Sequence, residues 1–158
     1  MNSIHQFKIE GIEDNEIDFA AFRGKKIIVV NVASECGYTS QYQQLQALYE
    51  EFGDRVVVVG IPTNDFGGQE PGTNLEINAF CSAQYGVRFP LAAKTSIKGP
   101  SPHPLYEWLT HADRNGVMDS AVSWNFQKYL LDEQGRLVTM LPSSVEPLDE
   151  QVLDWIGV

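Results

Sequence analysis

Two apolar segments, separated by one amphipathic segment, constrain the fold of this chain more than any other feature. The segments "KKIIVVNVA" (residues 25–33) and "RVVVVGIP" (residues 55–62) are rich in β-branched residues and lack polar/apolar alternation. This pattern is typical of strands covered on both faces. Between them, apolar side chains recur at helical spacing, namely Tyr42, Leu45, Leu48, Tyr49 and Phe52. The order strand, helix, strand predicts two parallel strands joined by a right-handed crossover.

The remaining segments predict shorter elements around this unit. A hairpin is expected over residues 5–22, with its turn at residues 13–15, and a second over residues 124–141, turning at residues 133–135. A short strand is expected over "VRFPL" (residues 87–91), and helices over residues 103–113 and 147–157. These elements together predict an α/β protein with a thioredoxin-like fold, in which helices flank a central mixed β-sheet and an N-terminal β-hairpin is added.

Length and composition fit one globular domain over residues 1–158. The chain is 43% hydrophobic and 20% charged, and it contains no repeat or linker. Its net charge of −10 argues against binding nucleic acid, which requires a basic face. No apolar run is long enough to span a membrane, and no secretory signal is visible, so we expect a cytoplasmic protein.

The two cysteines, Cys36 and Cys81, are too few for a disulfide framework or a metal-ligand cluster. The three histidines are scattered along the chain, so we expect no metal and no cofactor. Cys36 follows the first apolar strand and precedes the amphipathic helix, which we expect Thr39 or Ser40 to cap. The carboxyl ends of parallel strands form the ligand-binding edge of open α/β sheets. At that corner, the free amides of the first helical turn favour a thiolate.

Cys36 is therefore a candidate nucleophile, although an inert buried cysteine is the alternative. The neighbouring carboxylate of Glu35 opposes a thiolate, costing roughly 0.5–2 kcal/mol at about 8 Å. We therefore expect further hydrogen-bond donors to point at the sulfur. Thr39 stands where many redox proteins carry a second cysteine, which argues against a dithiol oxidoreductase that acts on proteins.

Five motifs in order, "NVASECGYT", "IPTNDFGGQEPG", "FCSAQYGVRFP", "HPLYEWL" and "WNFQKYLLDEQG", resemble the cysteine branch of the glutathione peroxidase family. The resemblance covers nearly the whole chain. It implies reduction of hydrogen peroxide and organic hydroperoxides, and it implies a thioredoxin-like fold. By motif, Cys36 matches the peroxidatic position, while Gln69, Trp124 and Asn125 match the rest of a catalytic tetrad. Two carboxamides and an indole are neutral groups that can donate to a thiolate and a peroxide oxygen.

The resemblance also implies that Cys81 is the resolving cysteine. The Thr-x-x-Glu capping box that begins at Thr73 predicts a helix running through Cys81. If the thiol faces inward, the helix must unwind locally before a disulfide with Cys36 can form. The implied reductant is thioredoxin or a similar dithiol protein, and glutathione is the less favoured alternative.

Three departures from the family pattern remain. Thr63 replaces a cysteine, Asp65 replaces a glutamine and adds negative charge, and the connection over residues 110–123 lacks the interface segment of tetrameric relatives. We therefore expect a monomer. A peroxide sensor or relay that passes its disulfide to a partner protein is an alternative function with the same two cysteines. A structural binding module with this fold would leave Gln69, Trp124 and Asn125 unexplained.

Overall fold

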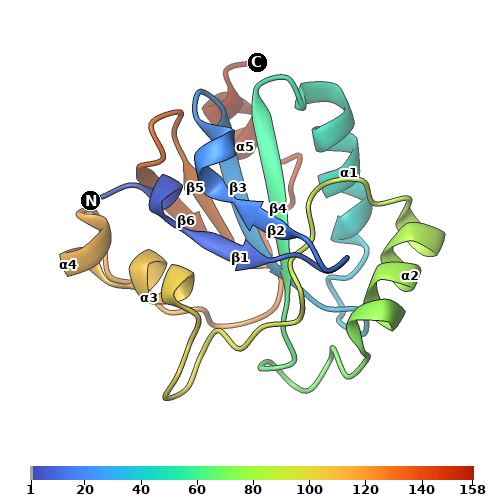
Figure 1. Cartoon of the computed structure of the whole chain (residues 1–158). Helices are drawn as coiled ribbons and strands as arrows, with labels where there is room; N and C mark the ends of the chain where they lie inside the picture. Colours follow the sequence, from blue (N-terminus) through green and yellow to red (C-terminus); the bar gives the residue numbers. More distant parts are fainter. Residues whose placement is uncertain (1) are drawn as a thin grey trace.

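The computed structural model describes residues 2–158 as a mixed sheet with a separate N-terminal hairpin (Figure 1). In chain order the elements are η1 (Ile4–Gln6), β1 (Lys8–Glu10), β2 (Glu16–Asp18), η2 (Phe19–Phe22), β3 (Lys26–Val32), α1 (Gln41–Phe52), β4 (Val56–Pro62), α2 (Asn74–Tyr85), α3 (Pro104–Thr110), α4 (Ala112–Asn115), β5 (Lys128–Leu131), β6 (Leu137–Leu141) and α5 (Glu150–Ile156).

The main sheet has four strands in the order β4-β3-β5-β6. Strands β3 and β4 are parallel, and Ile28 pairs with Val58, as the two apolar segments predict. Strand β5 runs antiparallel to both β3 and β6, so the sheet is mixed. The turn between β5 and β6 closes where the amide of Gly135 donates to the carbonyl of Asp132, which confirms the predicted second hairpin.

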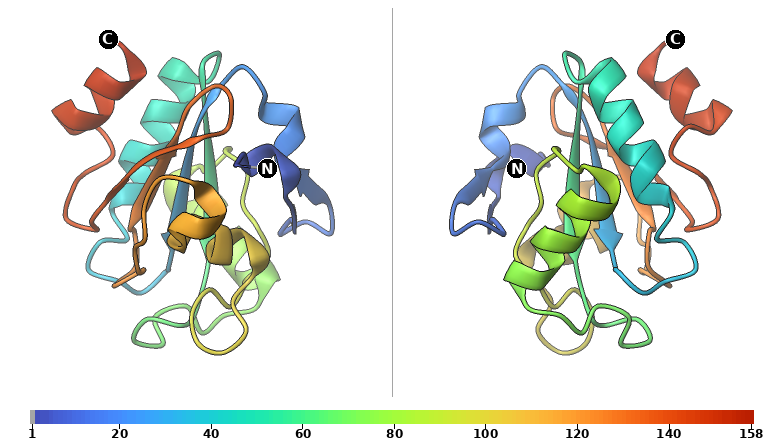
Figure 2. Two further views of the ribbon diagram at one scale, coloured as in Figure 1. Left: turned by 90° about the vertical axis from the view of Figure 1, so that its left-hand side faces the viewer. Right: turned by 90° about the vertical axis from the view of Figure 1, so that its right-hand side faces the viewer.

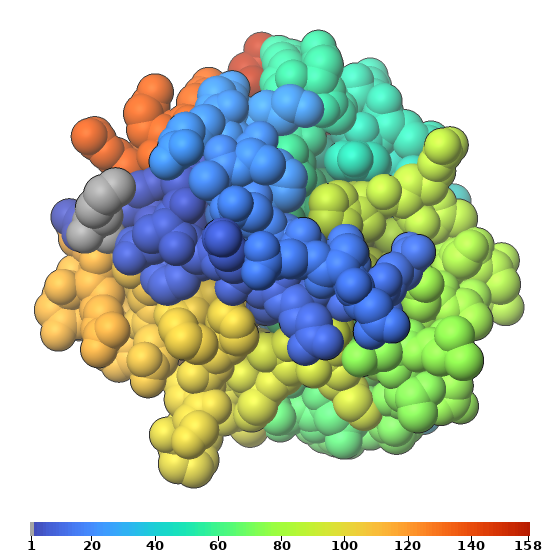
Figure 3. Space-filling view, viewed as in Figure 1, coloured from blue at the N-terminus to red at the C-terminus, as the bar shows by residue number. Residues whose placement is uncertain are grey.

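Side chains of the sheet alternate between two hydrophobic cores. On one face, Ile28 and Val30 of β3 pack with residues of α1, α2 and α5. On the other face, Ile27 and Val29 pack with η1, the β1–β2 hairpin, η2 and α3. Figure 2 shows α1 and α5 on one side of the sheet and the N-terminal hairpin on the other. In the space-filling view, the N-terminal segment covers the centre of its face (Figure 3).

The predicted strand over residues 87–91 is wrong. In place of a strand, Leu91 and Ala92 form isolated bridges, with Gly60 and Gly11 respectively. Pro90 has no N–H with which to continue a ladder, and the amide of Val87 is used at the end of α2. The helix predicted over residues 103–113 is also interrupted, because His111 has an extended backbone between α3 and α4.

Within residues 2–158, no helix is long and apolar enough to cross a lipid bilayer.

Helices α1 and α2 have the same length, 12 residues, but they are anchored very differently. Six residues of α1 are buried, whereas α2 buries only Ile77 and Cys81. Both ends of α2 are well capped, by the Thr73 capping box and by Gly86 in the left-handed conformation. Few buried contacts mark a segment that opens at low free-energy cost. The weak part of α2 is therefore its attachment to the core.

We predict that the backbone amides of α2 exchange with solvent deuterium at least about tenfold faster than those of α1 in the reduced protein. The two helices have the same length and lie in one molecule, so pH, temperature and solvent are the same for both. Hydrogen exchange with peptide-level mass spectrometry measures the difference. Equal protection of α1 and α2 would contradict this account of α2.

Candidate active site

Cys36 lies in the short connection between β3 and α1, and its side chain is half-buried. The backbone N–H of Tyr38 donates a hydrogen bond to Sγ, with the nitrogen 3.3 Å from the sulfur. The amide of Cys36 donates to Oγ1 of Thr39 at 2.9 Å, and that hydroxyl donates to the carbonyl of Ala33. The turn therefore fixes the cysteine backbone and points one backbone donor at the sulfur, as expected for this corner.

The predicted position of the α1 N-cap is confirmed, because Ser40 occupies it. The side chain of Ser40 makes no capping hydrogen bond, however, and its backbone is already helical. Thr39 is used differently, because its hydroxyl bridges Cys36 and Ala33. The residue in the slot of a second cysteine thus holds the backbone of Cys36 in place.

Gln69 lies in the loop between β4 and α2, and this loop is docked on the end of β3. The amide of Glu35 donates to the carbonyl of Gln69 at 3.0 Å, and the amide of Ser34 donates to Oε1 of Glu70 at 3.1 Å. The amide of Glu70 in turn donates to Oδ1 of Asn64. These hydrogen bonds place Gln69 beside the segment that carries Cys36.

Asn125 is fully buried and connects this loop with the residues that precede β5. Its Nδ2 donates to the carbonyl of Phe66 at 3.2 Å and to Oε1 of Gln69 at 3.1 Å. Trp124 packs edge-to-face on Phe66, with ring centroids 6.3 Å apart. The structure therefore brings Gln69, Trp124 and Asn125 together around one loop.

Two donors of this cluster remain available for a ligand. Because Oε1 of Gln69 accepts from Asn125, the amide nitrogen Nε2 of Gln69 is directed away from that bond. Within residues 2–158, neither this Nε2 nor the indole Nε1 of Trp124 has a hydrogen-bond partner. Neither group is therefore hydrogen-bonded to Sγ of Cys36, which accepts from the Tyr38 amide. Uncharged donors without a protein partner suit the stabilisation of a developing anion.

Asn31 was not singled out from the sequence, although it is the one polar residue inside the apolar run of β3. It is fully buried, and its Nδ2 donates to the carbonyl of Trp124 at 3.1 Å. The backbone carbonyl of Asn31 accepts a hydrogen bond from the backbone amide of Phe126. The φ of Phe126, 65°, is unusual for a bulky residue. Asn31 thereby fixes the backbone on both sides of Asn125. A buried amide in an otherwise apolar strand is the signal that could have identified it.

The two extra carboxylates noted in the sequence have different surroundings. Glu35 is exposed. Asp65 is committed to a loop, because its Oδ2 accepts from the amides of Ile97 and Lys98, at 2.7 and 3.1 Å. These two backbone donors hold the Asp65 carboxylate against residues 97–98. Thr63, which replaces a cysteine of the family pattern, is fully buried and accepts from the amide of Asp65.

Cys81 is a free thiol on the inward face of α2 and is fully buried. Burial is the main cause that raises the pKa of this thiol to about 11, and the Glu70 carboxylate adds to the rise. The Tyr42 hydroxyl partly offsets it from close by, although the two groups do not meet in a well-aligned hydrogen bond. Cys81 is thus a protonated thiol, shielded from solvent in this conformation.

Within residues 2–158, no group of three or more His, Cys, Asp or Glu side chains could hold a metal ion.

The sequence profile of the glutathione peroxidase family matches residues 4–110. The chain belongs to the glutathione peroxidase family. The resemblance expected from the five motifs is therefore confirmed, and so is the general activity, that of a peroxidase.

Two relatives illustrate this membership of the glutathione peroxidase family. The hydroperoxy fatty acid reductase gpx1 of Synechocystis is 44% identical over 161 residues, covering 97% of this chain and 94% of that protein. The glutathione peroxidase homolog BsaA of Staphylococcus epidermidis is 38% identical over 148 residues, covering 93% of each chain.

Solved structures agree with the fold of this glutathione peroxidase. The crystal structure of Trgpx in its apo form shares 33% identity with a TM-score of 0.73, and it covers 99% of this chain and 96% of that one. The crystal structure of Trypanosoma cruzi GPX1 shares 27% identity with a TM-score of 0.74, covering 98% and 97%. A DsbF homologue from Corynebacterium diphtheriae, at 21% identity and a TM-score of 0.61, shows the thioredoxin-like fold alone.

We predict that Gly67→Ala lowers the peroxidase rate by at least about tenfold. Both Gly67 and Gly68 have left-handed backbones, with φ of 71° and 63°. A Cβ at Gly67 would lie 2.8 Å from Cη2 of Trp124, whereas a Cβ at Gly68 meets nothing within 4 Å. Gly68→Ala is therefore the matched control, because both variants carry a backbone strain of about 1–2 kcal/mol but only one displaces the indole.

Peroxide turnover and thermal unfolding measure the two effects separately. Similar losses of stability with a selective loss of rate in Gly67→Ala are expected. Equal rates in the two variants would show that the position of the indole is unimportant.

Proposed function

We propose that this protein is a thiol peroxidase that uses Cys36 as its peroxidatic cysteine and Cys81 as its resolving cysteine. The observation that carries the proposal is the cluster of Gln69, Trp124 and Asn125 on a loop that is hydrogen-bonded to Glu35, the residue before a half-buried thiol that already accepts a backbone hydrogen bond. Its physiological role would be a response to oxidative stress.

In the first step, the Cys36 thiolate attacks one oxygen of the hydroperoxide and the O–O bond breaks. The sulfur becomes a sulfenic acid, and the other oxygen leaves as water or an alcohol after taking up a proton. The Tyr38 amide stabilises the thiolate, while Nε2 of Gln69 and Nε1 of Trp124 donate to the peroxide oxygens. Asn125 is a positioning residue, because its Nδ2 donates to the carbonyl of Phe66 and to Oε1 of Gln69 and thereby orients the Gln69 side chain.

In the second step, the Cys81 thiol attacks the sulfenic sulfur, a disulfide forms and water leaves. Burial and a raised pKa make Cys81 a poor nucleophile while α2 is closed. Because α2 buries only two residues, it opens more easily than α1, and opening returns the thiol to solvent. We therefore infer that unwinding of α2 gates the disulfide, and that hydrogen exchange of α2 rises further on oxidation.

In the third step, an external dithiol attacks the Cys36–Cys81 disulfide, and a mixed disulfide resolves to give two free thiols and an oxidised reductant. We favour thioredoxin or a similar dithiol protein, because one encounter with a dithiol completes the exchange. Two free cysteines and a net charge of −10 fit a protein of the cytoplasm that does not bind nucleic acid.

Organic hydroperoxides are included among the proposed substrates. The relative that is 44% identical is named a hydroperoxy fatty acid reductase, which supports lipid hydroperoxides as one class. We also propose that the protein is a monomer. The connection after α3 folds back on itself, since the carboxamide of Asn115 donates to the carbonyls of Trp108 and Met118.

We predict that Cys36→Ser abolishes turnover of hydrogen peroxide and of a lipid hydroperoxide, because no nucleophile remains. Cys81→Ser should instead consume one equivalent of peroxide per protein and then stop, because the sulfenic acid has no internal partner. Oxidation of NADPH, coupled through thioredoxin and its reductase, measures both variants, and a stoichiometric peroxide assay detects the single reaction.

Glutathione with its reductase is the control for the reductant. Turnover supported equally well by glutathione would contradict the preference for a dithiol protein. Full cycling of Cys81→Ser would contradict the role of Cys81. Stoichiometric oxidation of the wild type without cycling in either system would favour a sensor that passes its disulfide to another protein.

A further inference from the structure

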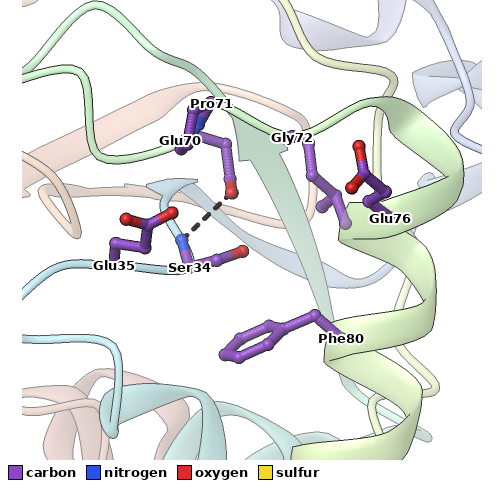
Figure 4. A pocket seen from close by; sticks show the side chains of 8 residues that line it. Ser34, Glu35, Glu70, Pro71, Gly72, Glu76 and Phe80 are labelled. Carbon is purple, nitrogen blue, oxygen red and sulfur yellow. Dashed lines mark hydrogen bonds between the residues drawn. The ribbon is translucent and has the colours of Figure 1, made fainter.

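An acidic pocket of about 390 Å³ lies between the start of the Cys36 segment and the helix that carries Cys81. Glu35 and Ser34 lie on one side, Glu76 and Phe80 of α2 lie on the other side, and Glu70 lies between them with its carboxylate pointing toward Ser34 (Figure 4). No step of the proposed peroxidase reaction uses any of these side chains. Three carboxylates around one pocket beside a reactive cysteine call for a separate explanation.

Glu70 is the feature that distinguishes this pocket from an ordinary acidic surface. It is only 1% exposed, and its Oε1 accepts from the amide of Ser34 at 3.1 Å. Its second oxygen, Oε2, is buried without a hydrogen-bond partner, and so is the hydroxyl of Ser34. A buried carboxylate oxygen without a donor is costly, and a bound donor would relieve that cost.

The charges around Glu70 leave this carboxylate undercompensated. Burial, the largest cause, raises the pKa of Glu70, and the Glu35 carboxylate raises it further. The hydrogen bond from the Ser34 amide, the nearby Ser34 hydroxyl and the ammonium of Lys94 lower the pKa and so act in the opposite direction. That ammonium donates to the backbone carbonyls of Glu70 and Gly72 and forms no ion pair with a carboxylate of the pocket. Within residues 2–158, Lys94 is therefore the one cation whose charge acts on Glu70 and Glu76, and it does not line the pocket.

The sides of the pocket suit a cation on an apolar stem. Glu76 closes the capping box of α2, so its carboxylate is held at the rim by the amide of Thr73. Phe80 points across the pocket toward Ser34 and Glu35 (Figure 4). An aromatic face next to carboxylates favours an ammonium or guanidinium group by cation–π attraction as well as by charge.

We propose that this pocket receives a protonated amine or a guanidinium carried by the thiol that reduces the enzyme, and that Glu35, Glu70 and Glu76 thereby select the reductant by charge. The inference rests on the proposed function, because it concerns the third step. Glu35 directly precedes Cys36, and Glu70 is bonded to the amide of Ser34, so these two carboxylates stay beside Cys36 when α2 opens, and a cation held by them lies next to the disulfide. An anionic thiol is repelled from the same position.

The test uses three small thiols that differ in charge: cysteamine (cationic), 2-mercaptoethanol (neutral) and 3-mercaptopropionate (anionic). Each enzyme disulfide consumes two thiols and releases one small disulfide. The enzyme is oxidised with one equivalent of hydrogen peroxide, and the rate of its reduction is expressed per thiolate. The ratio of the cysteamine rate to the 3-mercaptopropionate rate is then compared between protein variants, so that the intrinsic reactivity of each thiol cancels.

In Glu35→Gln/Glu76→Gln, this ratio should fall at least about fivefold below that of the wild type. Glutamine at position 76 preserves the capping box, so α2 keeps its start. The matched control is Glu51→Gln/Asp54→Asn, which removes two exposed charges at the far end of α1 and should change the ratio less than about twofold. About 0.5 M salt should reduce the wild-type ratio toward that of the pocket variant.

A second arm separates a small cationic thiol from a protein. It uses a Cys-Gly-Pro-Cys peptide flanked by two lysines and the same peptide flanked by two glutamates. A charge preference that disappears in Glu35→Gln/Glu76→Gln in either arm supports the proposal, and the arm that shows it identifies the source of the cation. The same ratio in wild type and pocket variant in both arms would overturn it.

Failure of the peroxidase proposal gives a different result. If peroxide does not oxidise Cys36 of the wild type, no disulfide forms and both proposals fall. If oxidation is normal and only the charge preference is missing, the pocket inference alone is overturned.

Discussion

The arrangement of the site depends on how the loop between β4 and α2 is docked against the end of β3. Backbone amides of Ser34 and Glu35 donate to Glu70 and Gln69, and the buried carboxamide of Asn125 joins the same loop from the β5 side. Without these bonds, nothing would fix the position of the Gln69 backbone or the orientation of its side chain. With them, Gln69 and the Asn125 carboxamide that orients it are tied to the segment that carries Cys36. The acidic pocket is a product of the same docking, because Glu70, which is bonded to Ser34, lines it.

Much of the fold follows from periodicity in the sequence. The β3–α1–β4 unit and the β5–β6 hairpin were predictable because apolar runs, helical spacing and turn residues all agree there. Cys36 could be placed at a strand-to-helix corner from the same pattern. Gln69, Trp124 and Asn125 could be proposed only through resemblance to a family, since an isolated glutamine, tryptophan or asparagine carries no spacing signal.

Features that depend on long-range packing could not be predicted from local sequence. Lys128 begins β5 and is nearly fully buried, with its ammonium donating to the carbonyls of Ser143 and Val145. Burial lowers the pKa of Lys128 to about 7, yet its sequence context resembles an ordinary half-exposed strand. The burial of Glu70 and Asn31 has the same origin, because each satisfies backbone groups of a distant segment. The segment at residues 87–91 does not form a strand, because the amide of Val87 donates to the carbonyl of Cys81 at the end of α2 and Pro90 has no N–H to donate.

The most direct test of the account is the rate at which hydrogen peroxide oxidises Cys36 when Asn125 can no longer orient Gln69. Stopped-flow fluorescence would compare Cys81→Ser with Cys81→Ser/Asn125→Ala, after circular dichroism has shown that both variants are folded. We expect the second-order rate constant to fall by about 10- to 100-fold, as when an oriented donor is lost from a developing anion. An unchanged rate constant in the folded double variant would contradict the central claim that docked, uncharged donors make this thiol reactive.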